Sequence, residues 1–152
     1  MPDEIKEYVP DEIDLKIINI LCQNARARAK DIANEIFVSA TTVAFRIERL
    51  EKNGIIKGYR VAIDNEKVGY AIKAFINLEV APSGKQEFYK FIKGCKNVVE
   101  CNCVTGEYSM LIEVVFKSTT DLDIFIGELQ QYGKTKTQIV FSTSVDHRNE
   151  FL

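Results

Sequence analysis

The chain has 152 residues, of which 46% are hydrophobic and 28% charged, the balance of a globular protein with one domain or two small ones. No apolar run reaches the roughly 18–20 residues that cross a bilayer, and residues 1–4 lack the apolar stretch of a secretion signal. The four cysteines form neither a dense disulfide framework nor CxxC pairs. We therefore expect a cytoplasmic protein with reduced thiols and no membrane partner.

The net charge of −2 conceals an uneven distribution along the chain. Residues 1–14 carry six acids and one lysine, whereas residues 15–60 carry nine basic residues and four acids. Residues 61–152 carry ten basic and twelve acidic residues. A compact basic segment within an acidic chain is the electrostatic footprint of a nucleic-acid-binding domain.

The first 60 residues contain the pattern of three helices. Asp11 can cap a helix over about residues 12–22, whose apolar side chains fall at helical spacing. A short helix over about residues 29–36 follows, and it lacks a good cap because Arg28 stands where Ser or Thr is expected. Ser39 then caps a third helix that ends at Gly54.

The short link between the second and third helices predicts a helix-turn-helix. Residues 55–64 have the pattern strand, loop, strand, with Gly58 at the bend, and we interpret them as a wing. The predicted DNA-binding domain covers residues 1–60, and residues 61–70 form a linker or connecting strand.

The second half of the chain, residues 71–152, predicts a ferredoxin-like βαββαβ domain, so the fold class is α+β. The elements are expected in the order strand, helix, strand, strand, helix, strand, over residues 71–80, 85–93, 98–104, 108–116, 118–129 and 135–145. We expect this domain to hold the protein together as an oligomer and to sense an effector.

The third helix carries the candidate contacts to double-stranded DNA. Arg46, Arg49 and Lys52 are spaced three residues apart, and we expect them to point away from the core. The alternative is a solvated helix in which Glu48 and Glu51 neutralise these bases. The predicted DNA-binding residues, including two arginines ahead of the second helix, are Arg26, Arg28, Ser39, Thr41, Thr42, Phe45, Arg46, Arg49 and Lys52.

No constellation of catalytic or metal-binding residues is evident. Cys101 and Cys103 alternate along a predicted strand, so both should face the same side, and we expect them to be small buried apolar side chains without a metal. His147 is the one histidine and lies in a polar tail without a nucleophile beside it. We therefore predict no enzyme activity and no cofactor.

From residue 11 to about residue 147 the chain resembles the Lrp/AsnC family of feast/famine transcriptional regulators. The resemblance begins with DEIDLKII at residues 11–18 and DIA at residues 31–33. It continues through SATTVAFRIERL and EKNGIIKGY at residues 39–59, which are similar to the family's recognition helix and wing. GY at residues 69–70 and VTGEY at residues 104–108 resemble segments of its second domain.

This resemblance implies a homodimer formed by the ferredoxin-like domains, often assembled into an octamer, with the third helix in the major groove. It also implies that an amino acid or related carboxylate binds between dimers. We accordingly predict an effector site at the loop formed by Val104, Thr105, Gly106, Glu107, Tyr108 and Ser109.

The chain departs from the family pattern at several positions. Phe37 replaces the usual Gly of the helix-turn-helix, and Phe45 stands where a second Arg is frequent. Ser109 replaces an Asp that commonly helps to hold the effector's amino group, which predicts an altered choice among free amino acids.

Two alternative functions stay open at this point. An architectural DNA-compacting protein would have the same DNA-binding domain and no effector. A tetrapyrrole decarboxylase related to the family would need His and Arg side chains around a large pocket, and the lone His147 argues against it.

Overall fold

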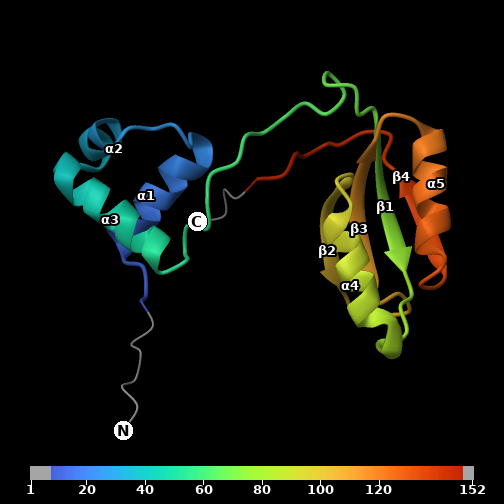
Figure 1. Cartoon of the computed structure of the whole chain (residues 1–152). Coiled ribbons are helices and arrows are strands. Elements are labelled where there is room, and N and C mark those ends of the chain that lie inside the picture. The colour runs from blue at the N-terminus through green and yellow to red at the C-terminus, as the bar shows by residue number, and fades with distance from the viewer. Residues whose placement is uncertain (1–7, 149–152) are drawn as a thin grey trace, which may run out of the picture. The chain divides into compact units, whose positions relative to one another are not determined.

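The computed structural model describes residues 8–148, which form two compact units (Figure 1). One unit comprises residues 8–62 together with residues 145–148, and the other comprises residues 63–144. Residues 1–7 and 149–152 of the two predicted domains lie outside the described part of the chain.

The first unit consists of helices α1 (Glu12–Gln23), α2 (Ala29–Ile36) and α3 (Ala40–Lys52). Each helix begins as its sequence predicts: Asp11 accepts the Ile13 and Asp14 amides, Ser39 accepts the Thr42 amide, and Arg28 supplies no side-chain cap. The three helices pack around one small core, made of Ile17, Leu21, Ile32, Ala33, Val43 and Leu50.

The turn between α2 and α3 is made without glycine. Phe37 ends α2 in the left-handed conformation, with φ 59° and ψ 46°, and its side chain is almost fully exposed. The amides of Phe37 and Val38 both donate to the carbonyl of Ala33, which satisfies the helix end. The turn geometry therefore survives the loss of glycine, at the steric cost of a Cβ in this conformation.

The predicted wing does not form as a β-hairpin. The described residues 53–64 contain no strand; Ile55 and Ile56 instead bond back to the Leu50 carbonyl and pack against the core of the first unit. An isolated two-stranded hairpin is marginally stable, and the described part of this unit offers no further strand to support one.

The second unit is a four-stranded antiparallel sheet with helices packed on one face. Its elements are β1 (Ile72–Leu78), a 3₁₀ turn η1 (Pro82–Gly84), α4 (Lys85–Gly94), β2 (Val98–Cys103), β3 (Met110–Phe116), α5 (Thr119–Leu129) and β4 (Thr135–Ile139). The strand order β2-β3-β1-β4 and the element order βαββαβ are those of the predicted ferredoxin-like fold.

Alternation along the strands separates a covered face from an open one. Alternate residues of β1 and β3, such as Ile76 and Ile112, are buried in one core with Phe88 of α4 and Phe125 of α5. The residues between them face the side of the sheet that neither helix covers.

The last strand is shorter than predicted. It ends at Ile139 instead of residue 145, because its pairing partner β1 begins at Ile72 and the final ladder bond runs from the Val140 amide to the Lys73 carbonyl. The β-rich sequence beyond that point has no described neighbouring strand with which to pair.

Candidate nucleic-acid interface and effector loop

Helix α3 has an inner face, an outer face and a flank directed toward α1. Val43 and Leu50 are both fully buried and mark the inner face of the helix. Because successive residues of an α-helix are rotated by about 100°, the opposite face carries four residues that follow one another at spacings of four, three and four. These four residues are all exposed, and we call them the outer stripe: Thr41, Phe45, Glu48 and Lys52.

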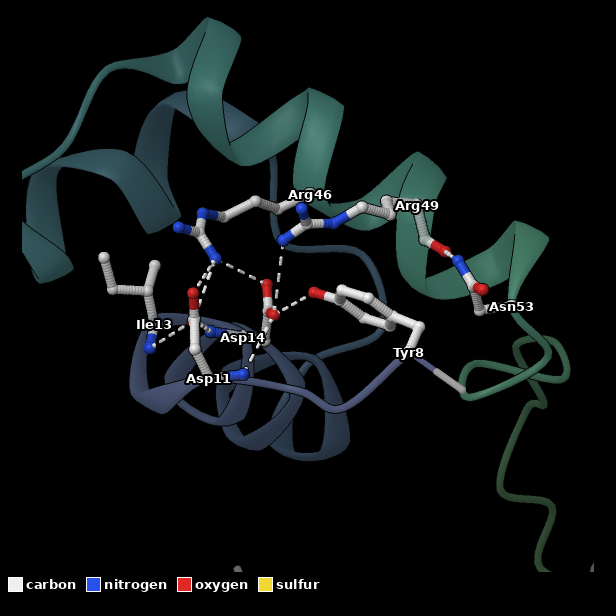
Figure 2. A network of polar contacts seen from close by, with 7 residues as sticks. All are labelled: Tyr8, Asp11, Ile13, Asp14, Arg46, Arg49 and Asn53. Atoms are coloured by element: carbon white, nitrogen blue, oxygen red, sulfur yellow. Dashed lines mark hydrogen bonds and ion pairs between the residues drawn. The ribbon is translucent and has the colours of Figure 1, made fainter. Parts of the chain in front are cut away.

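Arg46 lies on the flank of α3 and not on its outer face, which corrects the expected outward placement. Its side chain is 17% exposed, and Nη1 donates to Asp11 Oδ2 at 2.7 Å and to Asp14 Oδ1 at 2.8 Å (Figure 2). The expectation was wrong because residue 46 follows the buried Val43 by three positions, which leaves it near the core side of the helix.

The side chain of Arg49, about one helical turn after Arg46, is also directed toward Asp14. Its Nη2 lies 3.5 Å from Asp14 Oδ2, and its guanidinium lies 4.4 Å from the ring centroid of Tyr8 (Figure 2). Its side chain is 35% exposed, so a part of it still reaches the surface.

Asp14 is the centre of this network and is completely buried. It accepts hydrogen bonds from the Tyr8 hydroxyl, from Arg46 and from the Asp11 amide. Burial alone would raise the pKa of its carboxyl, but these hydrogen bonds outweigh burial and lower the pKa below the ordinary 3.8. The carboxylate therefore stays ionised and ties the start of α1 to the middle of α3.

The sequence contained only a partial signal for this network. Asp11 and Asp14 are explained by capping alone, and they do form a capping box. Nothing local indicates that the Asp14 carboxylate also turns inward to meet two arginines more than 30 residues away. No pattern in the sequence indicated that Tyr8 would take part in the network.

The remaining predicted DNA-contact residues lie at the surface of the first unit. Arg26 and Arg28 are exposed ahead of α2, and Arg28 pairs with Asp31 at 2.9 Å. Lys52 pairs with Glu48 at 2.7 Å, as the surface-helix alternative predicted for that base. Ser39 and Thr42 share a hydrogen bond of 2.7 Å between their hydroxyls at the start of α3.

The segment that follows α3 is tied back to it. The Tyr59 hydroxyl donates to Glu51 Oε1 at 2.8 Å. Burial and this hydrogen bond raise the pKa of Tyr59 to about 12, so the hydroxyl stays protonated and keeps its donor role.

The predicted effector residues form the connection between β2 and β3. The Val104 amide donates to the Ser109 carbonyl at 2.9 Å and closes the loop, and Gly106 takes the left-handed φ of 114°. Within residues 8–148, no hydrogen bond uses the backbone amides of residues 105–108. Glu107 lies 3.8 Å from Lys134 Nζ, which places a positive charge beside the loop.

Ser109 is engaged by the fold itself. Its hydroxyl accepts the Val80 amide at 2.9 Å and lies 3.3 Å from the Val80 carbonyl, so it joins the ends of β1 and β3. A neutral side chain used in this way does not supply the negative charge that an Asp would offer to an amino group.

Neither a metal site nor a membrane span is found in the described residues. No group of three or more His, Cys, Asp or Glu residues among them could hold a metal ion, and no helix is long and apolar enough to cross a bilayer. Cys101 packs against the core, but Cys103 is exposed at the end of the edge strand β2 and is not the buried side chain expected. His147 is exposed.

The network makes the stability of the first unit depend on the charge of Asp14. Asp14→Asn replaces an acceptor oxygen by an NH₂ group that faces other donors, so we expect a loss of about 2 kcal/mol in the free energy of unfolding at neutral pH. Because the folded pKa is lowered, the wild-type contribution is fully present above the ordinary value of 3.8 and is lost as the pH falls through the lower, folded value. Urea unfolding followed by circular dichroism at several pH values measures both effects.

The matched control is Asp31→Asn, the same substitution in the exposed pair with Arg28. It should change the unfolding midpoint little at any pH. Equal midpoints for Asp14→Asn and Asp31→Asn would show that the Asp14 network does not support the fold.

The comparisons with known proteins agree with this architecture. A family model described as winged helix-turn-helix DNA-binding matches residues 10–57, and one described as the Lrp/AsnC ligand binding domain matches residues 73–150. The transcriptional regulator LrpA of Bacillus subtilis is 34% identical over 131 residues, covering 86% of this chain and 96% of that protein. The regulator Ptr1 of Methanocaldococcus jannaschii is 35% identical over 118 residues, covering 78% and 80%.

Solved structures show the same likeness over almost the whole chain. Bacillus subtilis LrpC superposes with a TM-score of 0.87 at 26% identity, covering 93% of this chain and 100% of that one. A Neisseria meningitidis transcriptional regulator solved in complex with L-methionine superposes with a TM-score of 0.86 at 22% identity, covering 95% and 97%. All of these relatives are transcriptional regulators, which decides against the enzyme alternative. The chain belongs to the Lrp/AsnC family and is a DNA-binding transcriptional regulator with a ligand-binding domain.

Proposed function

We propose that this regulator binds its operator as a homodimer or larger assembly, reads the major groove with α3, and responds to a small carboxylate ligand at the loop of residues 104–109. The observation that carries the DNA contact is the outer stripe of α3, which the fold leaves exposed within the basic segment of residues 15–60. Since a transcriptional regulator acts on the chromosome, the proposal places the protein in the cytoplasm.

The proposed contacts to DNA divide into two groups. Arg26, Arg28 and Lys52 are exposed bases suited to phosphates, and the outer stripe together with Ser39 and Thr42 at the start of α3 faces the groove. Arg46 and Arg49 act mainly by holding α3 against α1, because their guanidinium groups are engaged by Asp14.

Lys52→Ala tests the orientation of α3 on DNA. The side chain is 72% exposed, so its removal should leave folding intact while it weakens binding to every sequence alike. The slope of log affinity against log salt should flatten by about 1 for each contacting subunit. Fluorescence anisotropy with a selected operator at several salt concentrations measures the slope.

The control is Lys90→Ala, which removes an exposed lysine from α4 in the other unit and should leave the slope unchanged. An unchanged slope for Lys52→Ala as well would mean that the C-terminal part of α3 does not lie against DNA.

Dimerisation is proposed to use the open face of the sheet. Phe75, Leu111 and Val115 are half-buried there, beside the pair of Lys73 and Glu113 at 3.0 Å. An apolar sheet face that the chain's own helices leave uncovered is a natural surface for a second copy, and two recognition helices about one DNA turn apart require a two-fold partner. We also propose that such dimers assemble into an octamer.

A charge on the open face should separate the subunits. Leu111→Asp buries a carboxylate in the proposed contact and should give a monomer by sedimentation velocity at micromolar concentration. Ile124→Asp places the same charge on an exposed residue of α5 and should leave at least a dimer. A dimer that survives Leu111→Asp would exclude the open face as the dimer contact.

The effector proposal is supported by the amides of residues 105–108, which no hydrogen bond within residues 8–148 uses, by the left-handed Gly106 and by the nearby Lys134. Backbone amides in such a turn form an anion-binding concavity suited to a carboxylate. The L-methionine complex of the Neisseria regulator is consistent with an amino acid as ligand. Because Ser109 is neutral and bonded to β1, we expect weaker or altered choice among free α-amino acids.

Calorimetric titration with the common amino acids and their deaminated analogues tests the site. Gly106→Trp fills the loop and should abolish the heat of binding seen with the wild type. Gly69→Trp is the matched control, because Gly69 also has a positive φ, of 90°, and also has no atom within 4 Å of an added Cβ. Binding that survives Gly106→Trp places the effector elsewhere, and no binding by the wild type favours the architectural alternative.

A further inference from the structure

We propose that Phe45 contacts the methyl group of a thymine in the major groove and so fixes one base of each operator half-site. This inference rests on the proposed contact of α3 with DNA, and it adds the class of base that the helix selects.

Phe45 lies outside the core of the first unit and is exposed. Its side chain is 61% exposed at the second position of the outer stripe, opposite the core of the first unit. Thr41 precedes it by one turn, and the ion pair of Glu48 and Lys52 follows it. The middle of the stripe is therefore an apolar ring flanked by polar and charged groups.

The ring lies beside one side chain of the Asp14 network. The guanidinium of Arg49 lies 5.8 Å from the Phe45 centroid, and that guanidinium is itself fixed by Asp14 and Tyr8. Beside the ring is a hollow of about 190 Å³, also lined by Glu48, Arg49, Lys52 and Asn53. A group that enters the hollow would meet the ring without moving the helix.

The chemistry of the ring selects among the four bases. In the major groove guanine and adenine present acceptors or donors that require a polar partner, and cytosine presents an amino donor. Thymine alone presents a methyl group, and apolar side chains including Phe make the favourable contact with it. A phenyl ring offers no hydrogen bond to the other three bases, so a thymine opposite Phe45 is the match.

Uracil, which lacks only this methyl group, provides the test. An operator is selected from random duplexes with the full chain, and its thymines are then replaced by uracil one at a time. For the wild type, one replacement in each half-site should weaken binding about fourfold, the factor for burying one methyl-sized group. Phe45→Ala changes both subunits of the dimer, so it should bind the thymine operator about as weakly as the wild type binds the operator with uracil in both half-sites. It should no longer distinguish the two operators.

Two further variants separate this contact from a general loss of binding. Lys52→Ala should bind more weakly but keep the wild-type ratio of thymine to uracil affinity. Phe45→Arg should select operators that carry guanine at the position in question, because Arg pairs with the O6 and N7 of guanine. Circular dichroism should show unchanged unfolding for Phe45→Ala, since the ring is outside the core.

Three results would overturn the inference. Equal wild-type affinity for every uracil-substituted operator would mean that no thymine methyl is read, as expected if a second copy of the chain covers the ring. Discrimination that persists in Phe45→Ala would assign the contact to another residue, such as Thr41. A selection that enriches no sequence would reject sequence-specific binding by α3 and this inference with it.

Discussion

The buried carboxylate of Asp14 is the constraint on which the first unit depends. A core of six buried apolar side chains is small for three helices, and α1 and α3 meet where Tyr8, Arg46 and Arg49 converge on one carboxylate. A buried charge is tolerated only when its partners are in place, so the network defines one arrangement of the two helices and excludes others. The direction in which α3 presents its outer stripe follows from this arrangement.

The fold class and most elements could be predicted because local signals agreed with one another. Asp11 and Ser39 begin their helices as capping residues do, and strand alternation in the second half separates inner from outer residues. The wing and the end of β4 could not be predicted, because β-propensity does not say whether a partner strand is present. Strand sequences without a partner remain irregular.

The sequence predicted the residue types of the candidate site better than it predicted the directions in which their side chains point. The equal spacing of Arg46, Arg49 and Lys52 suggested that they share one face. A step of three residues, however, falls about 60° short of a full helical turn, so each of these side chains points in a different direction from the one before it. Only Lys52 reaches the outer stripe, whereas Arg46 turns toward α1. In the second unit, the bond from Ser109 to Val80 joins residues 29 positions apart, a contact that no local pattern reveals.

The division of α3 into a flank that holds the fold and a stripe that faces outward has a consequence for how such regulators diversify. Thr41, Phe45, Glu48 and Lys52 belong neither to the core nor to the Asp14 network, so drift at these four positions is nearly neutral for folding. On the proposed contact of the stripe with DNA, two copies that arise by gene duplication could acquire different target genes through these four positions, without a change in the flank that holds α3 against α1. A change of target gene would then not require any intermediate sequence that fails to fold.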